Sequence, residues 1–208
     1  MIRRSAAVCL ILLAACRTTR PPNAEPIAPL SANSPAEVAG QLADRRAQFR
    51  GERSLIRLKL GQVSARGQLQ IDSGGRLLMT IYSPIGTTVA RLYAEGDDVI
   101  FLNDFEATVS RGKAVDFGAL GGQTALLLVG LPPAGVEAIT YSASGIESVN
   151  LAGATIRFDP PAYPPQRVTI DQGQRHIEIQ HLESFVDTAT LKPPEIPSSY
   201  RCCVPPPL

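Results

Sequence analysis

The stretch RLLMTIYSPIGTTVARLYAEGDDVIFLN, residues 76–103, decides the fold. Leu77, Met79 and Ile81 alternate with polar neighbours, except at Leu78, and this two-residue period is typical of a strand with one apolar face. Two further runs of strand character follow, and the segments SPIG and EGD that separate the runs are rich in turn residues. The stretch therefore predicts three antiparallel strands joined by hairpins.

The same pattern continues on both sides of this stretch. Short runs rich in β-branched and long apolar residues alternate with turn signals at hairpin spacing, among them RSLIRLKL, QVSARGQLQI, FEATVS, VEAITYS, ATIRFD, QRVTIDQ and RHIEIQHLE. A sheet with one apolar face must curl round or be covered. We therefore expect a mainly β fold, a curved antiparallel sheet or incomplete β-barrel of about ten strands with a helical lid. The candidates to line an apolar cavity are Leu77, Met79, Ile81, Val99, Phe101, Ile156 and Phe158.

Two segments have the pattern of helices that could form the lid. In SPAEVAGQLADRRAQF (34–49), Ser34 is a suitable N-cap, Pro35 fits the first helical position and Glu37 completes a capping box. The segment GGQTALLLVGLPP (121–133) predicts a short apolar helix that ends at its glycine and prolines. The lid residues expected from the two helices are Val38, Leu42, Phe49, Leu126 and Leu127. For the first helix, packing on the sheet and contact with a ligand both stay open.

The N-terminus, MIRRSAAVCLILLAAC, has the pattern of an export signal. Its apolar run of about ten residues is half the length that a bilayer-spanning helix needs. Leu13-Ala14-Ala15-Cys16 resembles the lipobox of bacterial lipoproteins, which implies cleavage before Cys16 and a lipid anchor on its thiol and new N-terminus. An ordinary cleaved signal with a chance cysteine is the alternative. In well-studied sorting systems the absence of aspartate at the next position, here Arg17, implies the outer membrane.

Composition divides the chain into four parts. Proline and alanine are frequent after the signal and proline is frequent again at the end of the chain, and such segments favour extended spacers. The expected parts are a signal peptide at 1–15, a lipid-anchored flexible tether at 16–33, a folded domain at 34–192 and a Pro-rich tail at 193–208. The tail holds Cys202 and Cys203, for which a strained disulfide, a link between chains and no role at all stay open.

Charge and motifs argue against several classes of function. Removal of residues 1–15 takes away two arginines and no acidic residue, which leaves 18 basic and 19 acidic side chains, so binding to nucleic acid through bulk charge is not expected. The chain contains no nucleophile-elbow, Walker or Rossmann pattern. Its two histidines, His176 and His181, are five residues apart in a strand-like run and would point to opposite faces. We therefore expect no enzyme activity, no metal site and no cofactor.

A family resemblance rests on the order of several short motifs. These are Arg66-Gly67 before a strand, a strand leading into Pro84-Ile85-Gly86, a hairpin partner that contains Leu92, a turn at Gly96, and Gly130-Leu131-Pro132 after an apolar helix. In this order they resemble the LolB family of outer-membrane lipoprotein receptors, which shares an incomplete-barrel fold with the periplasmic carrier LolA. The sequence departs from the family in having no tryptophan, and residues 125–129 stand where the family often has one.

The resemblance implies a function. Such receptors accept acylated proteins from a LolA-like periplasmic carrier in an apolar cavity and insert them into the inner leaflet of the outer membrane, as lipid-anchored monomers that face the periplasm. It also implies that the loop Pro84, Ile85 and Gly86 contacts the membrane through Ile85. A different lipid cargo is compatible with the missing tryptophan. The alternatives are a structural or envelope-assembly lipoprotein that acts by protein contacts without a lipid cavity, and a lipid hydrolase.

Overall fold

The computed structural model describes residues 25–114, 122–133, 136, 138–151 and 153–203. The expected signal peptide, 1–15, and the expected lipid anchor, Cys16, lie outside the described residues. The described chain forms one twelve-stranded sheet in the order β12-β6-β5-β4-β3-β2-β1-β11-β10-β9-β8-β7. The strands are β1 (Gly51–Leu60), β2 (Val63–Asp72), β3 (Leu77–Tyr82), β4 (Thr88–Glu95), β5 (Asp98–Asn103), β6 (Thr108–Lys113), β7 (Ile139–Tyr141), β8 (Ile146–Leu151), β9 (Ala154–Phe158), β10 (Arg167–Gln172), β11 (Arg175–Val186) and β12 (Arg201–Cys203).

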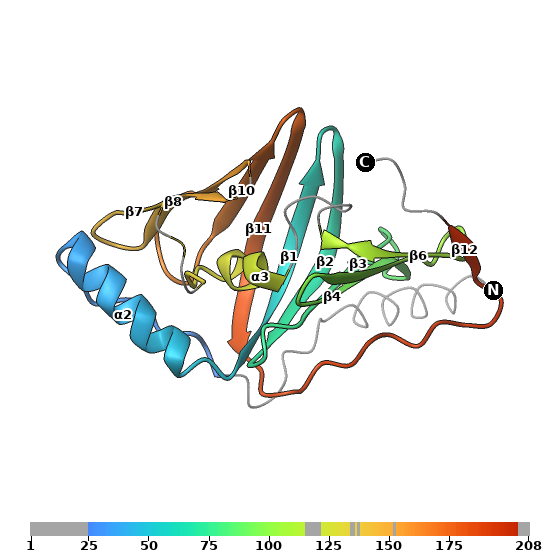
Figure 1. Cartoon of the computed structure of the whole chain (residues 1–208), viewed down its shortest axis with the longest axis horizontal. Coiled ribbons are helices and arrows are strands. Elements are labelled where there is room, and N and C mark those ends of the chain that lie inside the picture. The colour runs from blue at the N-terminus through green and yellow to red at the C-terminus, as the bar shows by residue number, and fades with distance from the viewer. Residues whose placement is uncertain (1–24, 115–121, 134–135, 137, 152, 204–208) are drawn as a thin grey trace, which may run out of the picture.

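The sheet consists of two antiparallel meanders that meet at β1 and β11. Strands β1 to β6 are consecutive neighbours, strands β7 to β11 are too, and β1 pairs with β11 in antiparallel fashion. The last strand, β12, is the exception because it pairs with β6 in parallel. The sheet curves without closing, and its two meanders face each other across a concave side (Figure 1). The prediction of a mainly β incomplete barrel is confirmed, with twelve strands in place of about ten.

Helix α2 (Pro35–Ala47) begins where the capping residues predict. The Ser34 hydroxyl accepts a hydrogen bond from the Glu37 amide at 3.3 Å, and the Glu37 carboxylate accepts one from the Asn33 amide at 2.8 Å. The first bond satisfies an amide that the first helical turn leaves without a partner, and the second holds the residue that precedes the N-cap. Val38 and Leu42 are fully buried, so α2 packs its narrow apolar stripe against the rest of the domain.

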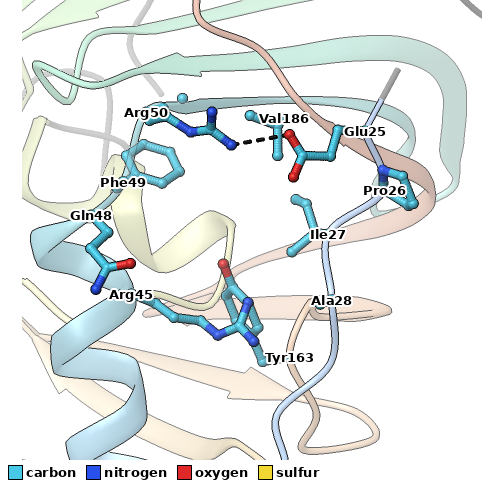
Figure 2. Close-up of a pocket in the computed structure, with 11 residues that line it drawn as sticks. Glu25, Pro26, Ile27, Ala28, Arg45, Gln48, Phe49, Arg50, Tyr163 and Val186 are labelled. Atoms are coloured by element: carbon cyan, nitrogen blue, oxygen red, sulfur yellow. Dashed lines mark hydrogen bonds and ion pairs between the residues drawn. The ribbon is translucent and has the colours of Figure 1, made fainter. Parts of the chain in front are cut away.

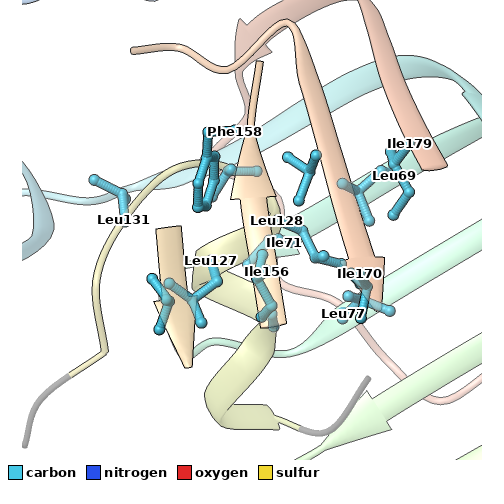
Figure 3. Packing of buried hydrophobic residues seen from close by; sticks show 14 of the residues in the cluster. Leu69, Ile71, Leu77, Leu127, Leu128, Leu131, Ile156, Phe158, Ile170 and Ile179 are labelled. Atoms are coloured by element: carbon cyan, nitrogen blue, oxygen red, sulfur yellow. The ribbon is translucent and has the colours of Figure 1, made fainter. Parts of the chain in front are cut away.

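Helix α3 (Gly122–Leu128) lies inside the concavity, between the two meanders (Figure 1). Gly130 ends it with a φ of 76°, and the Leu131 amide donates to the Leu126 carbonyl at 2.9 Å. Leu127 and Leu128 are fully buried among side chains from the strands (Figure 3). Among the described residues no helix is both long and apolar enough to cross a bilayer.

The segment before α2 belongs to the fold from residue 25 onward. The Val186 amide donates to the Glu25 carbonyl at 2.9 Å, and Pro26 forms an isolated bridge with Phe185. Ile27 and Leu30 are partly buried against the core. The end of the expected tether, 16–33, therefore belongs to the fold, because Glu25 and Pro26 bond to the end of β11 and the apolar side chains that follow pack against the core.

The segment after β11, which we call the C-terminal strap (187–203), also belongs to the fold. The Leu191 amide donates to the buried Asp72 carboxylate at 3.0 Å, and Leu191 itself is buried. The Tyr200 hydroxyl donates to Asp104 at 2.5 Å, just before β12 joins β6. The expected boundary at residue 192 is therefore too early. The sequence did not predict this packing. The segment is rich in proline and makes its contacts through single, separated side chains, so it has no periodic apolar pattern that would indicate a packed element.

Candidate functional site

The concave face of the sheet is apolar across both meanders. Register places cross-strand partners on the same face, so each row of partners runs round the inside of the barrel. One row joins Leu69, Met79, Leu92 and Phe101 from β2 to β5, and another joins Ile177, Ile170, Ile156 and Val149 from β11 to β8. The seven predicted cavity residues all lie on this face and in one hydrophobic cluster. The sequence period therefore identified the correct face.

The middle of the concave face is filled in this conformation. Leu77, Val99 and Ile156 have essentially no solvent-accessible surface, and Met79 and Phe158 have very little. Since α3 packs its leucines into the same cluster, these five residues behave as core and do not border an open space. Of the seven predicted lining residues, only Ile81 and Phe101 keep part of their surface accessible.

The predicted lid residues divide between two positions. Val38, Leu42 and Phe49 belong to α2 or follow it, and Phe49 is half-buried. Leu126 and Leu127 belong to α3, which is inside the concavity and so fills it instead of covering it. All five pack in the same hydrophobic cluster as the strands. The sequence predicted that both helices cover the sheet as a lid and left packing or ligand contact open for the first of them, but it could not predict that α3 lies inside.

Four turns of the sheet lie at the same end. We call this the hairpin end, because the turns β1–β2, β3–β4, β5–β6 and β10–β11 all lie there. Five apolar side chains of the concave face are only partly buried: Leu58, Ile81, Leu92, Phe101 and Ile177. Leu58, Ile81 and Ile177 lie toward the hairpin end, whereas Leu92 and Phe101 share a row with the buried Met79. These five form what we call the apolar floor.

Apolar side chains also project from the turns at the hairpin end. Ile85 of the β3–β4 turn is 86% exposed, Phe105 of the β5–β6 turn is 85% exposed, and Val63 beside the β1–β2 turn is 69% exposed. They come from neighbouring hairpins, so they form a discontinuous apolar fringe beside the floor. Sequence reasoning found Ile85 and missed Phe105. The signal for Phe105 was a large aromatic residue between two acidic residues in a turn segment, Asp104 and Glu106.

The turn that carries Ile85 is held rigidly by its own hydrogen bonds. The Ser83 amide donates to the Thr87 carbonyl at 2.8 Å, and the Ser83 and Thr87 hydroxyls are 2.7 Å apart. The Gly86 amide donates to the Ser83 carbonyl at 2.9 Å, and Gly86 has a φ of 87°, a conformation that a residue with a side chain rarely adopts. Ile85 therefore points into solvent from a fixed turn and does not fold back onto the domain.

The end of the concave face opposite the hairpin end carries a buried polar cluster. Glu52 is 1% exposed, and its carboxylate accepts a hydrogen bond from the Ser54 hydroxyl at 2.7 Å. The hydroxyls of Ser54 and Ser184 are 2.8 Å apart. Burial raises the pKa of Glu52 to about 7, against the opposing effect of its serine hydrogen bonds. The two ends of the concave face therefore differ in polarity.

His181 is a second titratable group on this face, a partly exposed residue whose two ring nitrogens are buried. Burial lowers the pKa of its imidazole to about 4, and the nearby Leu128 backbone opposes this shift. Neither ring nitrogen makes a hydrogen bond of good geometry with the described residues. The other histidine, His176, is exposed, and its Nδ1 is 2.7 Å from the Asp171 carboxylate. The two rings therefore occupy different environments, in agreement with the expectation that they point to opposite faces of the sheet.

Two further pockets border α2. One, of about 560 Å³, lies between α2 and β7 and is lined mainly by apolar residues: Ala39, Ala43, Ala47, Pro132, Pro133, Val136 and Ile139, with Arg46 and Tyr141. The other, of about 390 Å³, lies between the end of α2 and residues 25–28 (Figure 2). In the second pocket the Arg45 guanidinium lies 5.1 Å from the centre of the Tyr163 ring, and Arg50 pairs with Glu25 at 3.1 Å. The first pocket is the better match to an apolar ligand, and its volume is in the range of small-molecule sites.

No family model matches the sequence, and no curated protein matches it either. Several solved structures are similar in fold. An uncharacterised conserved protein from Thermus thermophilus has 8% identity and a TM-score of 0.45, over 81% of this chain and 98% of the other. A LolA superfamily protein from Nitrosomonas europaea has 10% identity and a TM-score of 0.41, over 74% and 95%. A DUF1329 family protein from Desulfovibrio piger has 8% identity and a TM-score of 0.43, over 76% and 95%. Identities and TM-scores this low carry no conclusion about function.

Proposed function

We propose that this protein is a lipid-anchored receptor that binds acyl chains on its concave face and delivers acylated proteins, or another lipid, to the outer membrane. The observation that carries the proposal is the position of the apolar floor. Leu58, Ile81 and Ile177 of the floor lie toward the same end of the sheet where Ile85, Phe105 and Val63 project from neighbouring hairpins. A surface that shelters acyl chains and a fringe that can contact a bilayer are therefore adjacent, as transfer between them requires.

The energetics of an acyl chain explain why such a floor is needed. Each buried methylene contributes about 0.8 kcal/mol, so a chain of about fifteen methylenes would lose on the order of 12 kcal/mol if it were exposed to water. A carrier must therefore keep most of the chain in contact with apolar side chains. The floor and the middle of the concave face supply such contacts, but α3 fills the middle in this conformation. A full-length chain therefore requires α3 to move away from the strands.

The anchor and the fringe have different roles in this proposal. Acylation of Cys16, three chains in all, would hold the protein at the membrane almost permanently. Insertion of Ile85 alone would contribute about 1.5 to 3 kcal/mol, which is enough for repeated and reversible contact by a tethered domain. The tether available for this movement is residues 16–24, since the chain is packed on the domain from residue 25. A LolA-like carrier is the proposed donor of cargo, and the role involves no catalytic step.

Native mass spectrometry of the full chain in mild detergent tests the proposal. We expect a one-to-one complex with a diacylated lipopeptide and none with the same peptide without its acyl chains. Lipid or acylated peptide that co-purifies with the protein would support the proposal further. Equal binding of the two peptides, or binding of neither, would contradict it.

A structural or assembly role without a lipid cavity is the second candidate. Its support is the complete burial of Leu77, Val99 and Ile156, which is the packing of an ordinary core. The same experiment separates the two functions. A protein with a permanently filled concave face would bind neither peptide, whereas a carrier would bind the acylated one.

A further inference from the structure

A third pocket, of about 460 Å³, lies on the convex face at the hairpin end. Its lining comes from β1, β2 and the β3–β4 hairpin: Arg57, Ser64, Ala65, Arg66, Tyr82, Ser83 and Pro84. It contains two arginines, three hydroxyl groups and no acidic side chain. Pro84 connects it directly to Ile85 of the membrane-contact loop. The pocket is therefore next to the fringe but on the other face of the sheet from the apolar floor.

The two arginines of the pocket lie opposite each other on neighbouring strands, and their like charges lower the stability of the sheet. Arg57 and Arg66 are direct cross-strand partners on β1 and β2. Side chains at such positions are close neighbours, and like charges directly opposite each other destabilise a sheet. The bond that Arg57 makes is a long one of 3.5 Å to the Gln180 amide oxygen. Within the described part of the chain, no carboxylate pairs with either guanidinium. An anion bound between them would remove the repulsion.

The remaining polar groups suit an anion with several oxygens. Guanidinium groups donate in a planar fork that matches phosphate oxygens, and hydroxyl groups can donate as well. Ser64, Tyr82 and Ser83 supply hydroxyls from three different segments round the pocket. This is the chemistry of a phosphate site.

We propose that this pocket binds the phosphate of an anionic phospholipid headgroup while the neighbouring Ile85 enters the acyl region of the same leaflet. The inference deepens the proposed function, because it names the ligand chemistry of the surface through which the protein meets the membrane. Arginine side chains can remain at headgroup level while adjacent apolar residues lie deeper. The lipid would fix the depth and the orientation of the hairpin end.

Hydrogen–deuterium exchange of the full chain in nonionic detergent micelles tests the inference. Dioctanoyl phosphatidylglycerol is titrated into the micelles, and protection is measured in the segments 57–66 and 82–87. The variants are Arg57→Gln and Arg66→Gln. The matched control is Arg111→Gln, since Arg111 is also an exposed strand arginine but lies outside the pocket. We expect each pocket variant to raise the lipid concentration needed for half-maximal protection by about tenfold. The control should leave this concentration unchanged.

Parallel titrations identify the source of the phosphate. Inorganic phosphate and glycerol 3-phosphate should protect the two segments only at concentrations far above those of the lipid. Protection by inorganic phosphate at the same concentration as by the lipid would overturn the headgroup assignment. If wild type, Arg57→Gln and Arg66→Gln all reach half-maximal protection at the same lipid concentration, the site itself is overturned. Thermal melting provides the folding control, and neither pocket variant should melt below wild type, since each relieves a like-charge contact.

Failure of this inference is distinguishable from failure of the proposed function. The exchange experiment contains no acylated cargo, so its outcome does not depend on whether the concave face binds acyl chains. Loss of lipopeptide binding would leave the phosphate titration intact, and loss of the phosphate titration would leave lipopeptide binding intact.

Discussion

Replacement of Ile85 by glutamate separates a membrane-contact role from a structural one. Ile85 is 86% exposed and its turn is held by hydrogen bonds that involve Ser83, Gly86 and Thr87. A substitution at such a surface position changes the free energy of unfolding by about 0.5 kcal/mol or less. The variant should therefore fold and bind an acylated peptide as wild type does.

The expected loss is in contact with the membrane. Insertion of Ile85 contributes about 1.5 to 3 kcal/mol, and a glutamate at this position would also resist transfer into the bilayer. At 1.4 kcal/mol per factor of ten, the population of the membrane-contact state should fall by about tenfold to a hundredfold. The assay is transfer of a fluorescent acylated peptide from the full-length protein, anchored in one set of vesicles, to the bilayer. The variant should deliver at least tenfold more slowly.

Leu182→Glu is the matched control for this experiment. Leu182 is close to Ile85 in size and is also exposed, with 44% of its surface accessible. It lies along β11 and away from the hairpin end. It should deliver as wild type does. If Ile85→Glu delivers at the wild-type rate, or if it unfolds, the membrane-contact argument is refuted.

The other predictions concern the fringe, the buried acid and the helix inside the barrel. Phe105→Ser should slow delivery by less than Ile85→Glu does and should leave peptide affinity unchanged. The same vesicle assay measures both. A change in affinity would instead place Phe105 in the cargo site. Because the folded-state pKa of Glu52 is raised to about 7, the folded protein binds its proton more tightly than the unfolded chain, so this residue lowers stability as pH rises from about 4.5 to about 7. Urea unfolding at pH 5 and pH 8 should show Glu52→Gln gaining about 3 kcal/mol relative to wild type between those values, whereas a constant difference would contradict the pKa shift. Leu127→Ala should lower the free energy of unfolding by about 2 to 5 kcal/mol, since Leu127 is fully buried. The same variant should bind lipopeptide at least as tightly as wild type, because it weakens the packing of α3 that cargo must displace; weaker binding would show that α3 forms part of the cargo site.

Local patterns predicted the strands and the start of α2. The two-residue period identified which side chains of β3 face inward, and Ser34 with Glu37 identified the N-terminus of the helix. Both signals depend on residues that are close in sequence, so they can be recognised without knowledge of the three-dimensional structure.

The positions of the helices and of the terminal segments could not be predicted in this way. Whether α3 covers the concavity or fills it depends on the volume between two meanders that are far apart in sequence. The segment at 25–33 and the C-terminal strap pack through isolated contacts, such as the one between Leu191 and Asp72, that leave no period in the sequence.

The candidate site was only partly predictable for the same reason. Ile85 could be singled out because a large β-branched residue is unusual in a turn. Neither the neighbouring Phe105 nor the opposed pair Arg57 and Arg66 could be linked to it, because their proximity depends on strand order and register.

Photocrosslinking with a lipopeptide tests the central claim most directly. The peptide carries a diazirine near the end of one acyl chain and is bound to the full-length protein before irradiation. We predict adducts on the apolar floor, at Leu58, Ile81, Leu92, Phe101 or Ile177, and fewer of them when an excess of unlabelled lipopeptide competes. Adducts confined to the convex face, or no adducts that the competitor removes, would contradict the claim that the concave face shelters acyl chains.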